Sequence, residues 1–307
     1  MTQIGITERG DAYIDKYGWQ KWVFEEQKPA ILITKNPMGI LKEFPELFIK
    51  DSTGGLKGNV ILHATITGLG GTPFEPNVIP YNEQLDGIKE ILRDKNFCKE
   101  RLVIRQDPLF PTFIITDKRL KHYGYHVRNI WTFAFENGLR YRTSFFDYYP
   151  HVRVRTQEIH YDGSHYQLFI NKENVNEYIK DLNEIQTELH LPLDTRKDFL
   201  NIIQHDADKY NAQIEICGEP GLPCMGCLSK KDLDTFGINL EEEIKTGFQR
   251  PTCACLGIKH ELLNRKSPCI HNCMYCYWKD EKWLMPRVLH SHFATQDIFC
   301  LALSLYL

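Results

Sequence analysis

The sequence predicts an α/β fold based on a complete or partial (β/α) TIM-type barrel, and three observations support this prediction. Up to about residue 217, short runs rich in β-branched and aromatic residues alternate with stretches whose apolar residues recur every three or four positions. Such alternation of strands and helices favours a parallel sheet. Seven strand candidates in this segment suit a barrel better than a sandwich, and a doubly wound open sheet is the alternative.

The elements follow in order along the chain. Strands are predicted over residues 3–7, 30–34, 59–67, 101–105, 127–133, 141–146 and 213–217. Helices are predicted over residues 11–26, 83–95, 173–188 and 195–211, the last two with Asn171 and Asp194 as N-caps. Residues 148–170 interrupt this rhythm and are interpreted as an insertion. The predicted organisation is therefore a barrel-like domain (1–217), a cysteine-rich module (218–285) with one helical stretch over 229–244, and a tail (286–307) that either closes the core or is loosely ordered.

The composition is typical of a soluble globular protein, with 42% hydrophobic and 25% charged residues among 307. A net charge of −3 provides no general attraction to nucleic acid or to anionic membranes. The first residues contain no apolar core followed by a cleavage site, and no window approaches the roughly 18 to 20 apolar residues of a membrane span. We therefore expect a cytoplasmic protein.

Ten cysteines are the unusual feature of the composition, and eight of them lie between Cys217 and Cys276. Cytosolic thiols are kept reduced, so clustered cysteines indicate metal binding more than a disulfide framework. Cys98 and Cys300 stand apart from the others and are predicted to be buried apolar residues.

The sharpest motif is Cys269-Ile-His-Asn-Cys273-Met-Tyr-Cys276, a C-x3-C-x2-C pattern with the aromatic Tyr275 before its last cysteine. Three thiolates this close in a loop can hold three irons of a cubane [4Fe–4S] cluster and leave the fourth iron without a protein ligand. An open iron can chelate S-adenosylmethionine, and an electron from the cluster can then split its sulfonium. A zinc site is the main alternative.

The remaining clustered cysteines fit a zinc site better than the triplet does, because zinc ribbons favour paired C-x2-C units. They are Cys217, Cys224, Cys227, Cys253 and Cys255. The pattern leaves three interpretations open: a second cluster, a structural zinc, or a ligand supplied to the first cluster.

Polar residues follow several of the predicted strands. They include Lys35, Arg105, Asp107 and Asp147. In a parallel barrel these strand ends meet on one face, so the set predicts a shared polar site there. His63 is interpreted as a satisfied core histidine, and His271 as a solvated loop position rather than a proton donor or ligand. The stretch 140–155 interleaves arginines with aromatics, and we interpret it as a half-buried strand and loop rather than a site for single-stranded nucleic acid.

The triplet resembles the signature of radical S-adenosylmethionine enzymes, whose partial TIM-type barrels suit the rhythm described above. In that superfamily the cysteine loop usually lies near the N-terminus, whereas here it lies near the C-terminus. Further segments resemble one uncharacterised family, a domain of unknown function with a C-terminal cysteine cluster of this kind, similar in places to spore photoproduct lyase. These segments are Leu32–Pro37, His63–Gly68, Glu75–Val78, Arg101–Pro108, Ser144–Asp147, Cys217–Glu219, Gln249-Arg250, Cys253–Cys255 and Cys269–Tyr277.

The resemblance covers residues 6–278, with two departures. The family's first-strand segment is only loosely present as Thr7-Glu-Arg-Gly-Asp11, and the stretch between Cys255 and Cys269 is reshaped.

The resemblance implies an iron–sulfur protein of the radical S-adenosylmethionine type, acting on an unknown small-molecule or macromolecular substrate with a reductant such as flavodoxin or ferredoxin. Lys35 or Arg105 would pair with the methionine carboxylate, Asp107 or Asp147 would hold ribose hydroxyls, and Tyr275 would pack beside the cofactor. Two alternatives stay open: an electron-transfer or otherwise non-catalytic iron–sulfur protein, and a zinc-stabilised binding module on a barrel.

Overall fold

The computed structural model describes residues 3–72, 74–109, 120–146, 193–239, 253–263, 269–273 and 275–276. Their helices and strands follow in the order β1 (Ile4–Ile6), α1 (Tyr17–Gln20), the π-helix η1 (Lys21–Glu25), β2 (Ala30–Thr34), α2 (Pro37–Glu43), the 3-10 helix η2 (Pro45–Leu47), β3 (Val60–Thr65), α3 (Tyr81–Ile91), the 3-10 helix η3 (Lys99–Arg101), β4 (Leu102–Leu109), α4 (Leu120–Glu136), β5 (Arg140–Phe145), α8 (Leu193–Asp208), β6 (Ile214–Ile216), α9 (Lys230–Phe236) and β7 (Lys259–Glu261). None of the helices in these residues is long and apolar enough to span a bilayer.

The strands form one parallel sheet in the order β6-β5-β4-β3-β2-β1-β7. Strands β1 to β6 are neighbours in chain order, without the reversal that defines a doubly wound sheet. Strand β7 pairs with the edge of β1 that faces away from β2, and it does not pair with β6. The sheet therefore does not close into a barrel within the described residues. The architecture is a curled half-barrel, which confirms the partial (β/α) barrel among the predicted alternatives.

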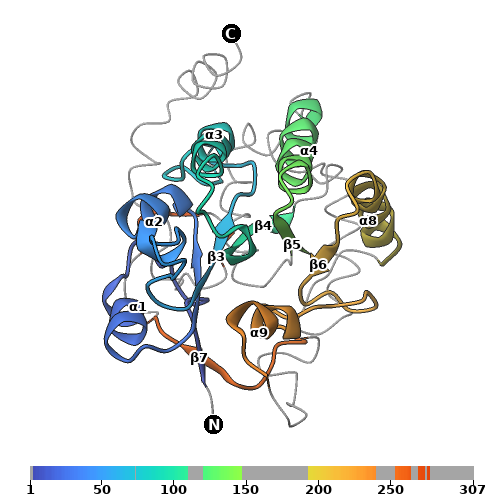
Figure 1. The fold of residues 1–307 in the computed structure, drawn as a ribbon. Helices are drawn as coiled ribbons and strands as arrows, with labels where there is room; N and C mark the ends of the chain where they lie inside the picture. The colour runs from blue at the N-terminus through green and yellow to red at the C-terminus, as the bar shows by residue number, and fades with distance from the viewer. Residues whose placement is uncertain are drawn as a thin grey trace.

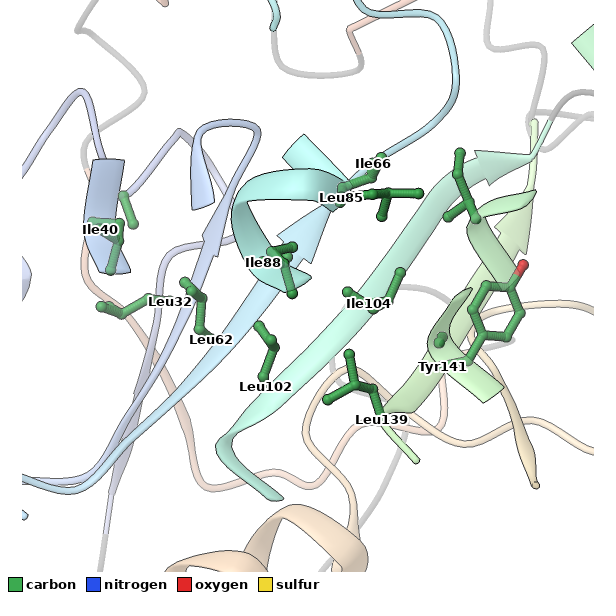
Figure 2. Packing of buried hydrophobic residues seen from close by; sticks show 14 of the residues in the cluster. Leu32, Ile40, Leu62, Ile66, Leu85, Ile88, Leu102, Ile104, Leu139 and Tyr141 are labelled. Carbon is green, nitrogen blue, oxygen red and sulfur yellow. The ribbon is translucent and has the colours of Figure 1, made fainter. Parts of the chain in front are cut away.

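Helices α2, α3, α4 and α8 cover the convex side of the sheet, and α9 lies across the open side between β6 and β7 (Figure 1). The convex core contains Leu32, Leu62 and Ile104 from successive strands, packed against Ile40 and Ile88 of the helices (Figure 2). Because side chains alternate across a strand, the intervening residues face the concave side. There Ile31, Ile61 and Val103 form a second apolar cluster with Leu233 and Phe236 of α9.

Six of the seven predicted strands are confirmed as β1 to β6, and one is wrong. Residues 127–133 lie within α4. Their β-branched and aromatic content resembles a strand, but Val127, Ile130, Trp131 and Ala134 are the buried residues, at the spacing of a helix face. The seventh strand is β7, which comes from the segment predicted as a cysteine-rich module.

The predicted helices differ from the observed ones mainly at their boundaries. The helix expected over 11–26 is helical only from Tyr17 to Glu25, and the one expected over 195–211 begins earlier, so Asp194 lies in its first turn instead of capping it. The stretch at 229–244 contains α9, capped by Ser229 and ended by Gly237 at φ 68°. Asn171, residues 148–170 and 173–188, and the tail lie outside the described residues.

Helix α2 was not predicted, although its start carries a local signal. Pro37 occupies the first turn, and the Asn36 side chain accepts a hydrogen bond from the Gly39 N–H at 2.9 Å. Replacing Asn36 with Ala is expected to lower the free energy of unfolding by about 1 kcal/mol, because an N-cap acceptor is lost. Urea denaturation measures this effect. Asn36→Asp, which retains a capping oxygen, is the matched control, and equal stability of Asn36→Ala and wild type would show that the cap contributes nothing.

Candidate metal and cofactor site

The cysteine loop lies against the carboxyl edge of the sheet and is held there by a buried carboxylate. Asp11, a few residues beyond β1, accepts hydrogen bonds from the Thr34 hydroxyl and the Lys35 backbone N–H, both at 2.7 Å. Its Oδ2 also lies 2.9 Å from Nε2 of His271, between the first two cysteines of the triplet. Burial would raise the pKa of Asp11, but the His271 contacts outweigh it and lower that pKa. His271 is buried, so its interpretation as a solvated loop position is wrong.

A second contact links the same loop to β2 and to the segment after β3. The Lys35 ammonium lies 2.6 Å from Oε1 of Glu75 and 2.8 Å from the Tyr275 hydroxyl, which itself donates to Glu75. Thr67 donates to the other Glu75 oxygen at 2.7 Å. Burial lowers the pKa of Lys35, but the charges of Glu75 and Cys273 reverse this and raise it. Lys35 is therefore a charged, fixed residue beside the triplet.

The three triplet thiols differ in exposure. Cys273 is buried, Cys276 is partly buried and Cys269 is exposed. Cys269 is exposed as a residue, but surrounding protein atoms still desolvate its thiol and raise its pKa to about 11. Burial also raises the pKa of Cys273, where Lys35 acts in the opposite direction. The charges of Cys269 and Cys276 further raise the pKa of Cys273, so the three sulfurs lie within electrostatic reach of one another.

Arg105 and Asp107 lie within β4 and not beyond its end, since this strand continues to Leu109. Arg105 is paired with Asp107, through a 2.8 Å bond from its Nε and a further contact from Nη2. The Ser144 hydroxyl donates to the other Asp107 oxygen at 2.5 Å. The structure thus brings Lys35, Arg105 and Asp107 to one edge, and Asp147 lies outside the described residues.

Four of the other cysteines gather on the concave side. The Sγ atoms of Cys217 and Cys227 are 3.2 Å apart, and the Cys227 N–H donates to the Cys255 sulfur at 3.2 Å. These three cysteines share one buried cluster, and Cys253 packs against it. Cys224 packs against the convex core instead, and its thiol is bonded to the backbone of Glu219. Cys98, predicted to be buried, is partly exposed at the start of η3 and donates to Glu100 at 3.3 Å. Cys300 is outside the described residues.

A charged network lies beside these thiols on the concave face. Its members are Arg140, Arg142, Glu215 and Asp232, of which all but Arg140 are fully buried, and the partly exposed Lys231, whose Nζ lies 3.0 Å from Glu215. These contacts show that the described part of the 140–155 stretch is a strand whose arginines are paired internally. His63 is fully buried, as predicted, but the prediction that it is satisfied is wrong for Nδ1; its Nε2 lies 3.5 Å from Nη1 of Arg142. An arginine only donates, so Nδ1 carries the His63 proton, and this atom has no partner among the described residues.

Sequence reasoning missed Asp11 and Glu75 as site residues. Glu75 lies in a segment that carries the family resemblance, and Asp11 lies in a segment that departs from it. A single carboxylate outside a regular pattern has no local signal, so the sequence did not single out either residue. Within the described ranges, no group of three or more His, Cys, Asp or Glu side chains has the geometry of a preformed metal site.

Fold and site define an α/β protein with a parallel half-barrel and a thiol-bearing loop fixed at its carboxyl edge. A family model described as "Domain of unknown function (DUF1848)" matches residues 21–278. The chain belongs to this family. Comparison with curated proteins found no match, and neither did comparison with solved structures.

Proposed function

We propose that this chain binds a [4Fe–4S] cluster through Cys269, Cys273 and Cys276 and uses it for radical chemistry with S-adenosylmethionine. The observation that carries the proposal is the attachment of the triplet loop to the carboxyl edge of a parallel half-barrel. Two buried contacts make this attachment, His271 to Asp11 and Tyr275 to Lys35 and Glu75. The carboxyl edge is where parallel (β/α) folds gather their catalytic groups.

The donor set supports iron–sulfur binding. All three side chains are thiols, the ligands that iron–sulfur clusters require, and their C-x3-C-x2-C spacing leaves one iron of a cubane without a protein ligand. When bound, such a cluster supplies the electron that cleaves the carbon–sulfur bond of S-adenosylmethionine.

The chain's own residues would bind and orient the cofactor. The Lys35 ammonium has three N–H donors, and the contacts to Glu75 and Tyr275 use two of them, which leaves one for a carboxylate. The Arg105–Asp107 pair lies on the same face and offers carboxylate oxygens for hydroxyl groups. Cys273 is buried beneath the loop, so water is kept from this sulfur.

Anaerobic purification and reconstitution test the proposal. Wild-type protein is expected to contain about four irons per chain and, with dithionite, to convert S-adenosylmethionine to 5′-deoxyadenosine. Cys273→Ser should lower both iron content and product at least tenfold, because one cluster ligand is lost. Cys98→Ser, a cysteine-to-serine change at the partly exposed surface thiol, is the matched control and should retain both. A fully loaded, reduced cluster that leaves the cofactor intact contradicts radical chemistry, and zinc without iron contradicts the cluster.

A further inference from the structure

The four thiols on the concave side form a group of their own. Cys217 and Cys227 are in direct sulfur–sulfur contact at 3.2 Å, Cys255 lies in the same buried cluster, and Cys253 packs against that cluster. The backbone N–H of Cys227 donates to the Cys255 sulfur at 3.2 Å. Three of the four side chains are buried. A thiol is only a weak hydrogen-bonding group, so contacts among the thiols themselves contribute little, whereas a common ligand would stabilise the group.

The group connects the two edges of the open sheet. Cys217 directly follows β6, whereas Cys253 and Cys255 precede β7, the strand at the opposite edge. Cys227 comes shortly before α9, which lies between these two strands (Figure 1). The sheet itself does not pair β6 with β7, but backbone hydrogen bonds from the Met225 N–H to the Ile216 carbonyl (2.6 Å) and from the Leu256 N–H to the Leu228 carbonyl (3.0 Å) link these segments. A ligand held by all four sulfurs would therefore reinforce a connection between the two edges that rests on few backbone contacts.

Buried cations surround the sulfurs. Nη1 of Arg105 lies 3.8 Å from the Cys227 sulfur, and Nη1 of Arg142 donates to the Cys227 carbonyl at 2.8 Å. Lys259 of β7 pairs with Glu8 at 2.5 Å, and a Glu8 oxygen is 3.8 Å from the Cys227 sulfur. A divalent ion with four thiolates carries a net charge of −2, and buried guanidinium and ammonium groups stabilise such a charge.

We propose that Cys217, Cys227, Cys253 and Cys255 bind one thiophilic divalent ion of the zinc class, which ties β6 to β7 and closes the open side of the half-barrel. Tetrahedral ligands at about 2.3 Å from a zinc ion lie about 3.8 Å apart, so the sulfurs now in contact must separate by about half an ångström. This explains why the group does not have the geometry of a preformed site. A cubane of irons and sulfides would require these sulfurs to move apart much further than a single ion does.

Cys224 is excluded from the ligand set, although it forms a C-x2-C unit with Cys227. Its sulfur accepts from the Glu219 N–H at 3.0 Å and donates to the Glu219 carbonyl at 2.9 Å, which closes a local turn. The chain therefore offers a matched control three residues from a proposed ligand.

Metal analysis of the full chain, purified anaerobically without chelators, tests the proposal. Wild type is expected to hold one zinc per chain, and Cys227→Ser or Cys255→Ser should lower the zinc content at least tenfold while iron is unchanged. Cys224→Ser should keep its zinc, and Cys273→Ser should lose iron but keep zinc. Because zinc and iron are measured separately in each variant, the concave site and the triplet are tested independently. Failure of one proposal therefore does not decide the other. Loss of zinc should also lower Tm by about 5–10 °C, because the ion binds only the folded chain.

Cobalt titration of the wild-type protein gives a second measurement that needs no variant to fold. After removal of zinc under reducing conditions, one equivalent of Co²⁺ should produce the near-ultraviolet thiolate-to-cobalt absorption of a tetrathiolate site. Absence of zinc together with absence of this absorption overturns the proposal. It is equally overturned if Cys224→Ser loses as much zinc as Cys227→Ser, or if the purified chain carries a Cys217–Cys227 disulfide and takes up no metal after reduction.

Discussion

Replacing Glu215 with Gln is expected to destabilise the fold by about 3–5 kcal/mol, because it leaves buried arginine charges without their main partner. The Glu215 carboxylate is fully buried and accepts hydrogen bonds from two arginines. Nε of Arg140 lies at 2.9 Å from one of its oxygens, and Nε and Nη2 of Arg142 lie at 3.0 and 2.5 Å from the other. In the variant, Asp232 would be the only carboxylate among the described residues paired with the two guanidinium groups, and the Lys231 ammonium would also lose its partner.

Urea denaturation at pH 7 measures this loss, and Glu90→Gln on the exposed surface of α3 is the matched control. The control should change the free energy of unfolding by no more than about 0.5 kcal/mol. A Glu215→Gln variant as stable as the control would show that the network contributes nothing to folding.

The contacts of Glu215 with Arg140 and Arg142 also predict that the stability of the fold depends on pH in acid. Burial alone would raise the pKa of Glu215, but Arg142 and Arg140 outweigh it and lower the pKa from 4.5 to about 2. A carboxyl whose pKa is depressed in the folded state stabilises the fold above its unfolded pKa, and this contribution disappears as pH falls through the folded pKa. The difference in unfolding free energy between wild type and Glu215→Gln should therefore shrink between pH 4.5 and pH 2. A difference that stays constant over this interval contradicts the assignment.

Replacing Asp11 with Asn is expected to weaken retention of iron by the triplet about 10- to 100-fold, the range found when residues that orient metal ligands are changed. Oδ2 of Asp11 accepts from the Lys35 N–H and faces His271 at 2.9 Å. The amide of Asn places a donor where an acceptor is needed, or it loses one of the other contacts when it rotates. The triplet loop would then be less firmly attached, and Lys35 would lose the backbone contact that positions it.

The rate of iron transfer from the reconstituted protein to a chelator measures this effect. Asp86→Asn, a carboxylate-to-amide change on the exposed face of α3, controls for charge and should transfer iron at the wild-type rate. Thermal unfolding of the metal-free variants separates loop attachment from general instability. Iron release from Asp11→Asn at the wild-type rate, with Tm unchanged, would show that the His271 contact does not support the metal site.

The sequence by itself determined the strands that form the centre of the sheet. Parallel strands are buried on both faces and therefore appear as short continuous apolar runs, such as Ala30–Thr34 and the residues of β3. The sequence did not predict the correct element where tertiary contacts override local preference. Residues 127–133 have strand-forming side chains but pack as one face of α4. Strand β7 contains only Lys-His-Glu, and it is a strand because β1 supplies its backbone hydrogen-bonding partner.

The sequence also determined that Cys269, Cys273 and Cys276 share one loop, since their spacing keeps them close in any conformation. Only the tertiary structure decided what surrounds them. His271 meets Asp11 across 260 residues, and Tyr275 meets Lys35 across 240. It also decided that Cys255 lies with Cys217 and Cys227 and not with the triplet. Contacts of this kind depend on which strand lies beside which, and a lone carboxylate, lysine or thiol carries no periodic pattern from which that pairing could be predicted.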